Sequence, residues 1–157
     1  MNNILDIILK DSYTLNLVKH RVKTLKSYLI SQLFSREKAA LESEDLIWLN
    51  SLDTSFYQQF SKDNIYEIFS DIEAKIGLLP LLNIYVPFAT NAQVISQIGQ
   101  YLRNTFGKII LFDTKFDPNL IAGCALSWKG IYRDYSLRSK IEEKKSEVLV
   151  GFKKYLR

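Results

Sequence analysis

The first half of the chain has the apolar spacing of amphipathic helices. In its longest segment the apolar residues recur three and four positions apart, at Leu15, Val18, Val22, Leu25, Leu29 and Leu33. This spacing places them along one face of a helix. Shorter segments with a similar pattern occur at residues 4–9, 41–52 and 65–76. The first half therefore predicts a bundle of short helices.

Polar residues in this half mark where the helices are expected to begin. A Ser, Thr or Asn followed three residues later by Glu or Gln is the signature of a capping box. The boxes that the sequence contains are Ser55/Gln58, Asn64/Glu67 and Thr90/Gln93, and Ser35 is the predicted cap of the segment 41–52. Gly77 and Gly107 follow periodic segments, so we expect both to end helices.

After residue 80 the pattern changes to short runs rich in β-branched and aromatic residues. The runs 81–88, 108–114, 121–128 and 131–134 are predicted strands. Helical spacing returns at residues 94–106, and Ser136 is positioned to cap a final helix. Lys129-Gly130 suits a tight hairpin turn. We therefore predict an α+β fold, with a helical bundle over residues 1–78 and a β-α-β-β-α domain over residues 79–157.

Charge is distributed unevenly around a modest net value of +4. Residues 1–38 hold 7 Lys and Arg against 3 Asp and Glu, and residues 39–128 hold 5 against 10. Residues 129–157 hold 9 against 4. Basic ends around an acidic middle suit contacts with more than one charged partner.

Residues with catalytic or metal-binding chemistry are scarce. His20 is the only histidine and Cys124 the only cysteine, which argues against a zinc site and against a nucleophile with a histidine base. The six glycines are scattered, so no phosphate-binding loop is present. We expect Cys124 to be a small core residue of a strand and His20 to lie on the surface. The expectation is a protein without catalytic residues, cofactor or metal.

Membrane insertion is also not expected from the sequence. The longest apolar run, residues 77–89, is too short to span a bilayer and contains two prolines. The first eleven residues lack a basic leader, which does not favour a signal peptide. Any membrane association would therefore go through a partner.

One ordered set of residues near the carboxyl end is distinctive. "FDPNLIAG" at residues 116–123, a hairpin, and "RDYSLRSKI" at residues 133–141 follow one another. This order resembles the signature of the δ subunit of F-type ATP synthases, whose mitochondrial equivalent is the oligomycin-sensitivity-conferring protein. The resemblance covers residues 65–145. The matching residues are Asp117, Pro118, Leu120, Ile121, Gly123, Asp134, Ser136, Leu137, Arg138 and Ile141.

Two departures from the family pattern stand out. Ala122 occupies the first of two positions that are usually glycine. The family's opening Tyr-Ala-x-Ala-Leu helix is absent, and the helical part is shorter than the family's six-helix bundle. The chain resembles a shortened, divergent member.

Physical chemistry gives the matched residues structural roles independently of the resemblance. Asp117 and Pro118 favour a turn, and Gly123 permits close approach of another backbone. Ser136 can cap the final helix, with Asp134 adding favourable charge at the same end. Arg138 and Glu142 have the spacing of a helical ion pair.

The resemblance implies a mechanical function. In this family the subunit joins the catalytic head to the peripheral stalk, so that rotation is coupled to proton-driven ATP synthesis. It lies on the cytoplasmic side of the membrane, or the organelle equivalent, and reaches the membrane only through the complex. The implied partners are the N-terminal segments of the α subunits and the C-terminal helices of the b-type stalk subunit; nucleic acid is not an implied partner.

Two stretches are candidate partner-binding surfaces. On the long first-half helix the candidates are Val18, Val22, Leu25 and Leu29, for which core packing is the alternative. On the final helix they are Val148, Leu149, Phe152 and Leu156. We expect the first half of that final helix to pack on the sheet. Its second half either contacts the stalk or packs on its own domain.

Two other functions remain open from the sequence. The first is a small basic nucleic-acid-binding protein, whose phosphate contacts would come from Lys140, Lys144, Lys145, Lys153, Lys154 and Arg157. The second is a free-standing helical adaptor with the same C-terminal fold.

Overall fold

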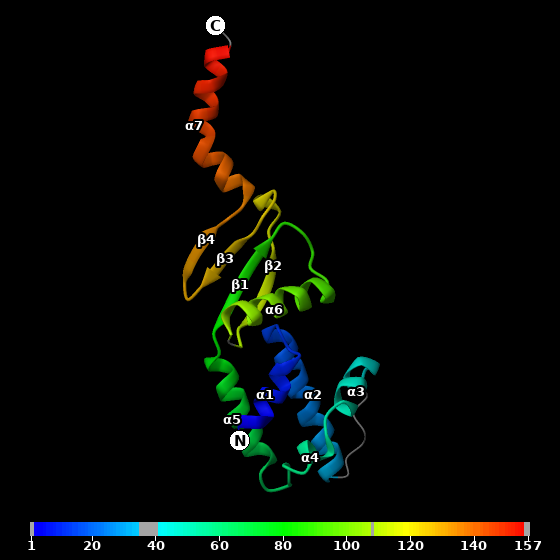
Figure 1. Ribbon diagram of the computed structural model, residues 1–157. Coiled ribbons are helices and arrows are strands. Elements are labelled where there is room, and N and C mark those ends of the chain that lie inside the picture. Colours follow the sequence, from blue (N-terminus) through cyan, green and yellow to red (C-terminus); the bar gives the residue numbers. More distant parts are fainter. Residues whose placement is uncertain (1, 35–40, 108, 156–157) are drawn as a thin grey trace. The chain divides into compact units, whose positions relative to one another are not determined.

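The computed structural model describes residues 2–34, 41–107 and 109–155 (Figure 1). It has the predicted α+β fold. The chain divides into two compact units, Met1–Leu79 and Pro80–Arg157. The sequence prediction placed this boundary one residue earlier, after residue 78.

The first unit consists of helices. They are α1 (Asn2–Lys10), α2 (Leu15–Phe34), α3 (Ser43–Asn50), α4 (Thr54–Tyr57) and α5 (Ile65–Leu78). Their apolar faces meet in a core that includes Ile8, Leu25 and Phe69, each fully buried. Phe60 joins α4 to α5, because its ring lies 5.4 Å from that of Phe56 and 5.8 Å from that of Phe69. The spacing of apolar residues therefore predicted the helices that build this core.

The second unit is a four-stranded sheet with helices. Its elements are β1 (Leu81–Val86), α6 (Ala92–Phe106), β2 (Leu111–Phe116), the 3-10 helix η1 (Pro118–Leu120), β3 (Ala125–Trp128), β4 (Ile131–Asp134) and α7 (Leu137–Tyr155). The strand order is β2-β1-β3-β4, with β1 and β2 parallel and the other pairs antiparallel. The parallel pair is connected through α6, as parallel strands require a crossover.

The β3–β4 hairpin forms where the sequence predicted it. Lys129 has φ 49° and Gly130 has φ 81°. Two consecutive positive φ values are the geometry of the turn whose twist matches a two-residue hairpin. The first predicted strand of the hairpin was too long, because residues 121–124 lie outside β3. Cys124 is therefore not a strand residue, and it is half-buried rather than in the core.

The predicted cap of α6 was wrong by one residue. Asn91, not Thr90, is the cap, since its side chain accepts a hydrogen bond of 2.9 Å from the backbone N–H of Val94. The hydroxyl of Thr90 instead lies 2.7 Å from the hydroxyl of Thr114 in β2. Gly107 ends this helix in the left-handed conformation, as predicted, with φ 60°.

The other predicted boxes do not form in the described residues. Ser55 lies inside α4, which begins at Thr54. Asn64 precedes α5, but its side chain accepts from the N–H of Ser61 at 2.7 Å instead of from the helix. Gly77 does not end α5, which continues to Leu78. The predicted cap Ser35 is outside the described residues.

Gly77 and Gly107 should respond in opposite ways to substitution by alanine. A Cβ at either position would meet nothing within 4 Å, so only the backbone conformation differs. Gly77→Ala replaces a glycine in a helix and should stabilise the protein by roughly 0.5–1 kcal/mol. Gly107→Ala should destabilise it by about 1 kcal/mol, because an alanine is strained at φ 60°. Urea denaturation followed by circular dichroism measures both, and equal effects would contradict the helix bounds.

Candidate partner-binding surfaces

The matched residues after β2 form a fixed turn. The backbone N–H of Asp117 donates to the carbonyl of Val86 at 2.9 Å, which ties the end of β2 to β1. The side chain of Asp117 accepts from the N–H of Asn119 at 3.0 Å and so caps η1, in which Pro118 is the first residue. Leu120 closes the turn with a buried side chain. The sequence predicted this turn, although not its helical form.

A close backbone approach follows at Gly123. Its φ is 89°, and a Cβ at this position would lie 2.8 Å from the carbonyl oxygen of Tyr135. Two hydrogen bonds flank the contact: the N–H of Tyr135 donates to Cys124 at 2.9 Å, and the N–H of Leu137 donates to Ala122 at 2.8 Å. Residues 122–124 therefore lie against residues 135–137. We call this contact the α7 joint.

Asp134 and Ser136 cap α7 at the same joint. The carboxylate of Asp134 accepts from the N–H of Ser136 at 2.7 Å. The hydroxyl oxygen of Ser136, which is fully buried, accepts from the N–H of Ser139 at 3.3 Å. Hydrogen bonds from the hydroxyl and the N–H of Ser136 lower the pKa of Asp134. The Nε of Arg138 lies 3.0 Å from a carboxylate oxygen of Glu142, an exposed pair that adds little stability.

The first half of α7 is not docked on the sheet, contrary to the sequence prediction. Leu137 and Ile141 are both about half-exposed, and the helix packs against η1. The charged residues of α7 explain this arrangement, since the described part holds three Glu and six Lys or Arg. A helix with this composition has too narrow an apolar face to pack against the sheet as α6 does.

One face of α7 nevertheless carries a row of exposed apolar side chains. Leu137, Ile141, Leu149 and Phe152 fall within one side of the helix at 3.6 residues per turn. Leu149 and Phe152 are exposed, as a partner surface requires. Of the other two predicted contact residues, Leu156 and the side chain of Val148 lie outside the described part of the chain. We call this row the α7 stripe.

The predicted partner-binding residues of α2 are in the core. Val18, Val22, Leu25 and Leu29 are all buried, so no partner helix can reach them in this structure. The alternative that the sequence left open, core packing, is therefore the one the structure adopts. The 3.6-residue pattern could not separate the two, because a groove and a core demand the same apolar face.

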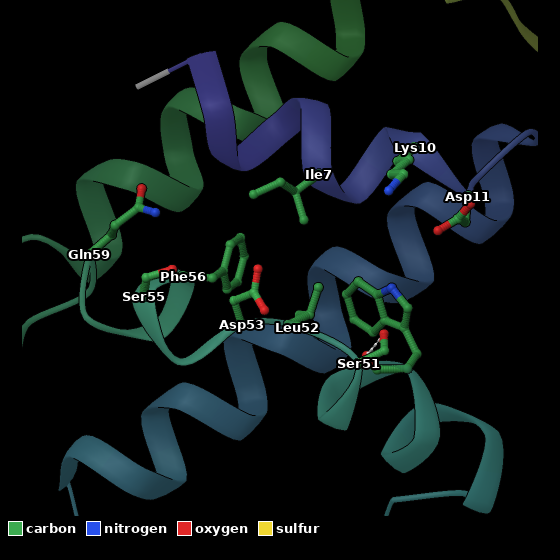
Figure 2. A pocket seen from close by; sticks show the side chains of 10 residues that line it. Ile7, Lys10, Asp11, Ser51, Leu52, Asp53, Ser55, Phe56 and Gln59 are labelled. Atoms are coloured by element: carbon green, nitrogen blue, oxygen red, sulfur yellow. Dashed lines mark hydrogen bonds between the residues drawn. The ribbon is translucent and has the colours of Figure 1, made fainter.

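A groove that the sequence did not indicate lies elsewhere in the first unit. It has a volume of about 340 Å³ and lies between α1 and the α3–α4 region (Figure 2). Figure 2 shows Ile7 pointing from α1 toward Phe56 and Leu52 on the opposite wall. Lys10 and Asp53 are charged residues of its lining. Its lining is thus mixed, with a few apolar side chains among more numerous polar and charged ones.

Neighbouring polar contacts hold the groove's walls in place. The guanidinium of Arg21 lies 4.9 Å from the ring of Trp48 and donates to the hydroxyl of Ser12 at 2.7 Å, and burial lowers its pKa. The hydroxyl of Tyr57 donates to the carbonyl of Leu49 at 2.6 Å. Burial raises the pKa of Tyr57 to about 12. These contacts therefore connect α3 to α2, and α4 to α3.

Groups that could hold a metal are absent from the described residues, where no three His, Cys, Asp or Glu side chains come together. His20 is exposed, and its Nε2 lies 2.9 Å from a carboxylate oxygen of Asp45. Within the same part of the chain, every helix is too short or too polar to cross a bilayer.

Neither a protein-family model nor a curated protein matches this sequence. The resemblance to the δ subunit thus rests only on the matched sequence segments, residues 116–123 and 133–141.

Substitution of Gly123 should disrupt the joint. Gly123→Ala places a Cβ against the Tyr135 carbonyl in a backbone conformation that alanine rarely adopts. We expect a loss of roughly 2 kcal/mol or more in the free energy of unfolding, measured by urea denaturation. Gly151→Ala, in the open part of α7, is the control and should not destabilise. Equal stability of Gly123→Ala and wild type would show that the approach is not obligatory.

The lowered pKa of Asp134 predicts how the joint responds to acid. Because its pKa is lower in the folded state, Asp134 stabilises the fold at neutral pH. That contribution is lost as the pH falls from about 3.8, its ordinary pKa, through the lower folded value. The stability difference between wild type and Asp134→Ala should therefore shrink on going from pH of about 6 to about 2. A constant difference in urea denaturation across this range would contradict an ionised cap.

Proposed function

We propose that this protein is the peripheral-stalk subunit of an F-type ATP synthase, linking the catalytic head to the stator stalk so that rotation is coupled to proton-driven ATP synthesis. It acts without catalytic residues or cofactor, as a peripheral component on the cytoplasmic side of the membrane or the organelle equivalent.

The observation that carries this proposal is the α7 joint. The residues matched to the δ-subunit signature are separated along the sequence, yet Gly123, Asp134 and Ser136 meet where α7 begins. Their shared effect is to anchor a basic helix whose apolar stripe is left exposed. A subunit that grips a stalk helix needs such a surface.

The second partner is proposed to bind the first unit. Amphipathic N-terminal segments of the α subunits need an apolar strip with charge at its border. The groove in Figure 2 places the apolar Ile7 and Leu52 near Lys10, in a lining that is otherwise largely polar. The groove takes the role that the sequence analysis gave to apolar residues of α2, because those residues are buried. They are Val18, Val22, Leu25 and Leu29.

The exposed aromatic side chains of the sheet support nucleic-acid binding less well than the α7 joint supports the stalk function. The rings of Tyr85 and Tyr132 lie 5.8 Å apart, and Lys115 approaches Tyr85 at 5.6 Å, which could form a stacking platform. However, burial and then the nearby carboxylates of Asp134 and Asp117 raise the pKa of Tyr132, so two carboxylates lie close to this ring. Carboxylates in this position repel phosphates.

Binding to two labelled peptides tests the proposal. One is the N-terminal segment of the α subunit, and the other is the C-terminal segment of the b-type stalk subunit, both from the same organism. We expect both to bind. Phe152→Asp should weaken stalk-peptide binding at least about tenfold, because it places a charge within the α7 stripe.

Val150→Asp is the matched control for that substitution. Val150 is 68% exposed and Phe152 is 63% exposed, but Val150 lies on the opposite side of the helix. The control should therefore bind as wild type does. Fluorescence anisotropy gives the dissociation constants. Failure of either peptide to bind at micromolar concentrations would refute the bridging function.

A further inference from the structure

Ile121 has a backbone conformation that isoleucine rarely adopts. Its φ is 64° and its ψ is −60°. The N–H of Ala122 donates to the carbonyl of Leu120 at 2.7 Å across it. These features define the γ-turn of positive φ, which is rare and strained. A β-branched side chain at positive φ is an outlier even among turns.

Packing does not compensate for this strain. The side chain of Ile121 is 63% exposed, so it contributes little to the core of its own unit. Glycine would adopt the same turn without steric cost. Strain that the fold does not need, at a residue facing solvent, indicates a role for the side chain outside the fold.

Ile121 lies in a groove between η1 and α7. The groove has a volume of about 560 Å³, and its lining includes Pro118, Ile121, Ile141 and Lys145. Ile141 belongs to the α7 stripe, so the groove is the end of that stripe nearest the joint. The two isoleucines supply apolar contacts from opposite walls.

The charges around the groove favour an acidic occupant. Of its three charged residues, Arg138 and Glu142 pair with each other at 3.0 Å. Lys145 remains as the basic group between Ile141 and the distal part of the stripe. Residues 129–157 as a whole hold 9 Lys and Arg against 4 Asp and Glu. A partner helix that matches this surface has an apolar row bordered by Asp or Glu.

We propose that the strained turn holds Ile121 outward as an anchor, and that Ile121 and Ile141 together bind the apolar row of an acidic amphipathic helix. In identifying this helix with the end of the b-type stalk subunit, the inference rests on the proposed function. The anchor itself is a property of this chain and can be tested separately.

Three substitutions separate the side chain from the strain. Ile121→Gly removes both, whereas Ile121→Ala keeps the Cβ, and therefore much of the strain, but removes the anchor. Ile131→Gly is the matched control, because Ile131 is 61% exposed but lies in β4 with ordinary strand geometry. Each variant is compared in the full chain by thermal unfolding and by peptide binding.

Two probes are titrated: the stalk segment, and a designed helical peptide with leucines along one face and glutamates elsewhere. Both Ile121 variants should weaken binding at least about tenfold. Ile121→Gly should nevertheless raise the melting temperature by roughly 2–4 °C, and Ile121→Ala should leave it within about 2 °C of wild type. Ile131→Gly should lower the melting temperature and leave binding unchanged.

The outcomes distinguish this inference from the proposed function. If the designed peptide binds through Ile121 but the stalk segment does not bind, the stator function fails and the anchor stands. If the stalk segment binds equally well to wild type and both Ile121 variants, the anchor is refuted and the stator function stands. If neither probe binds wild type, both fail. A melting temperature lowered by Ile121→Gly would refute the claim that isoleucine is strained at position 121.

Discussion

The second unit depends on one close approach between two backbone segments. At Gly123 the chain passes so near to Tyr135 that no side chain fits between them. Hydrogen bonds on either side of this point join residues 122 and 124 to residues 137 and 135. These contacts connect the end of the sheet to the start of α7, which has few other contacts with its unit. The position of the helix therefore follows from a single residue without a Cβ.

The signature residues act together because of this geometry. Asp117 fixes the turn that leads to Gly123, while Asp134 and Ser136 satisfy the N–H groups at the start of α7. Each contact is ordinary, and cap chemistry alone accounts for each residue type. Their combination sets where an exposed helix begins. Its effect is to fix the start of a helix whose apolar side chains face solvent.

Sequence patterns predicted the helices and strands of this fold better than they predicted which side chains are buried. Apolar spacing predicted the helices, and runs of β-branched and aromatic residues predicted the strands. Lys129-Gly130 and Gly107 predicted a turn and a helix end, because these depend on local conformation. Burial depends on what packs opposite an apolar residue, which one sequence does not contain. The apolar residues of α2 therefore looked like those of α7, yet Leu25 is in the core and Leu149 is exposed. The same limit concealed the groove beside Ile7 and the backbone of Ile121.

The exposure of α7 has a consequence for how much of the protein persists in a cell. Most of the stability of a helix in a protein comes from packing of its apolar face, and α7 receives little such support. Segments that open easily are the ones that proteases cleave first. If α7 binds the proposed stalk helix, a bound copy is shielded from proteases and a surplus copy is not. Degradation would then match the abundance of this chain to that of the stalk subunit.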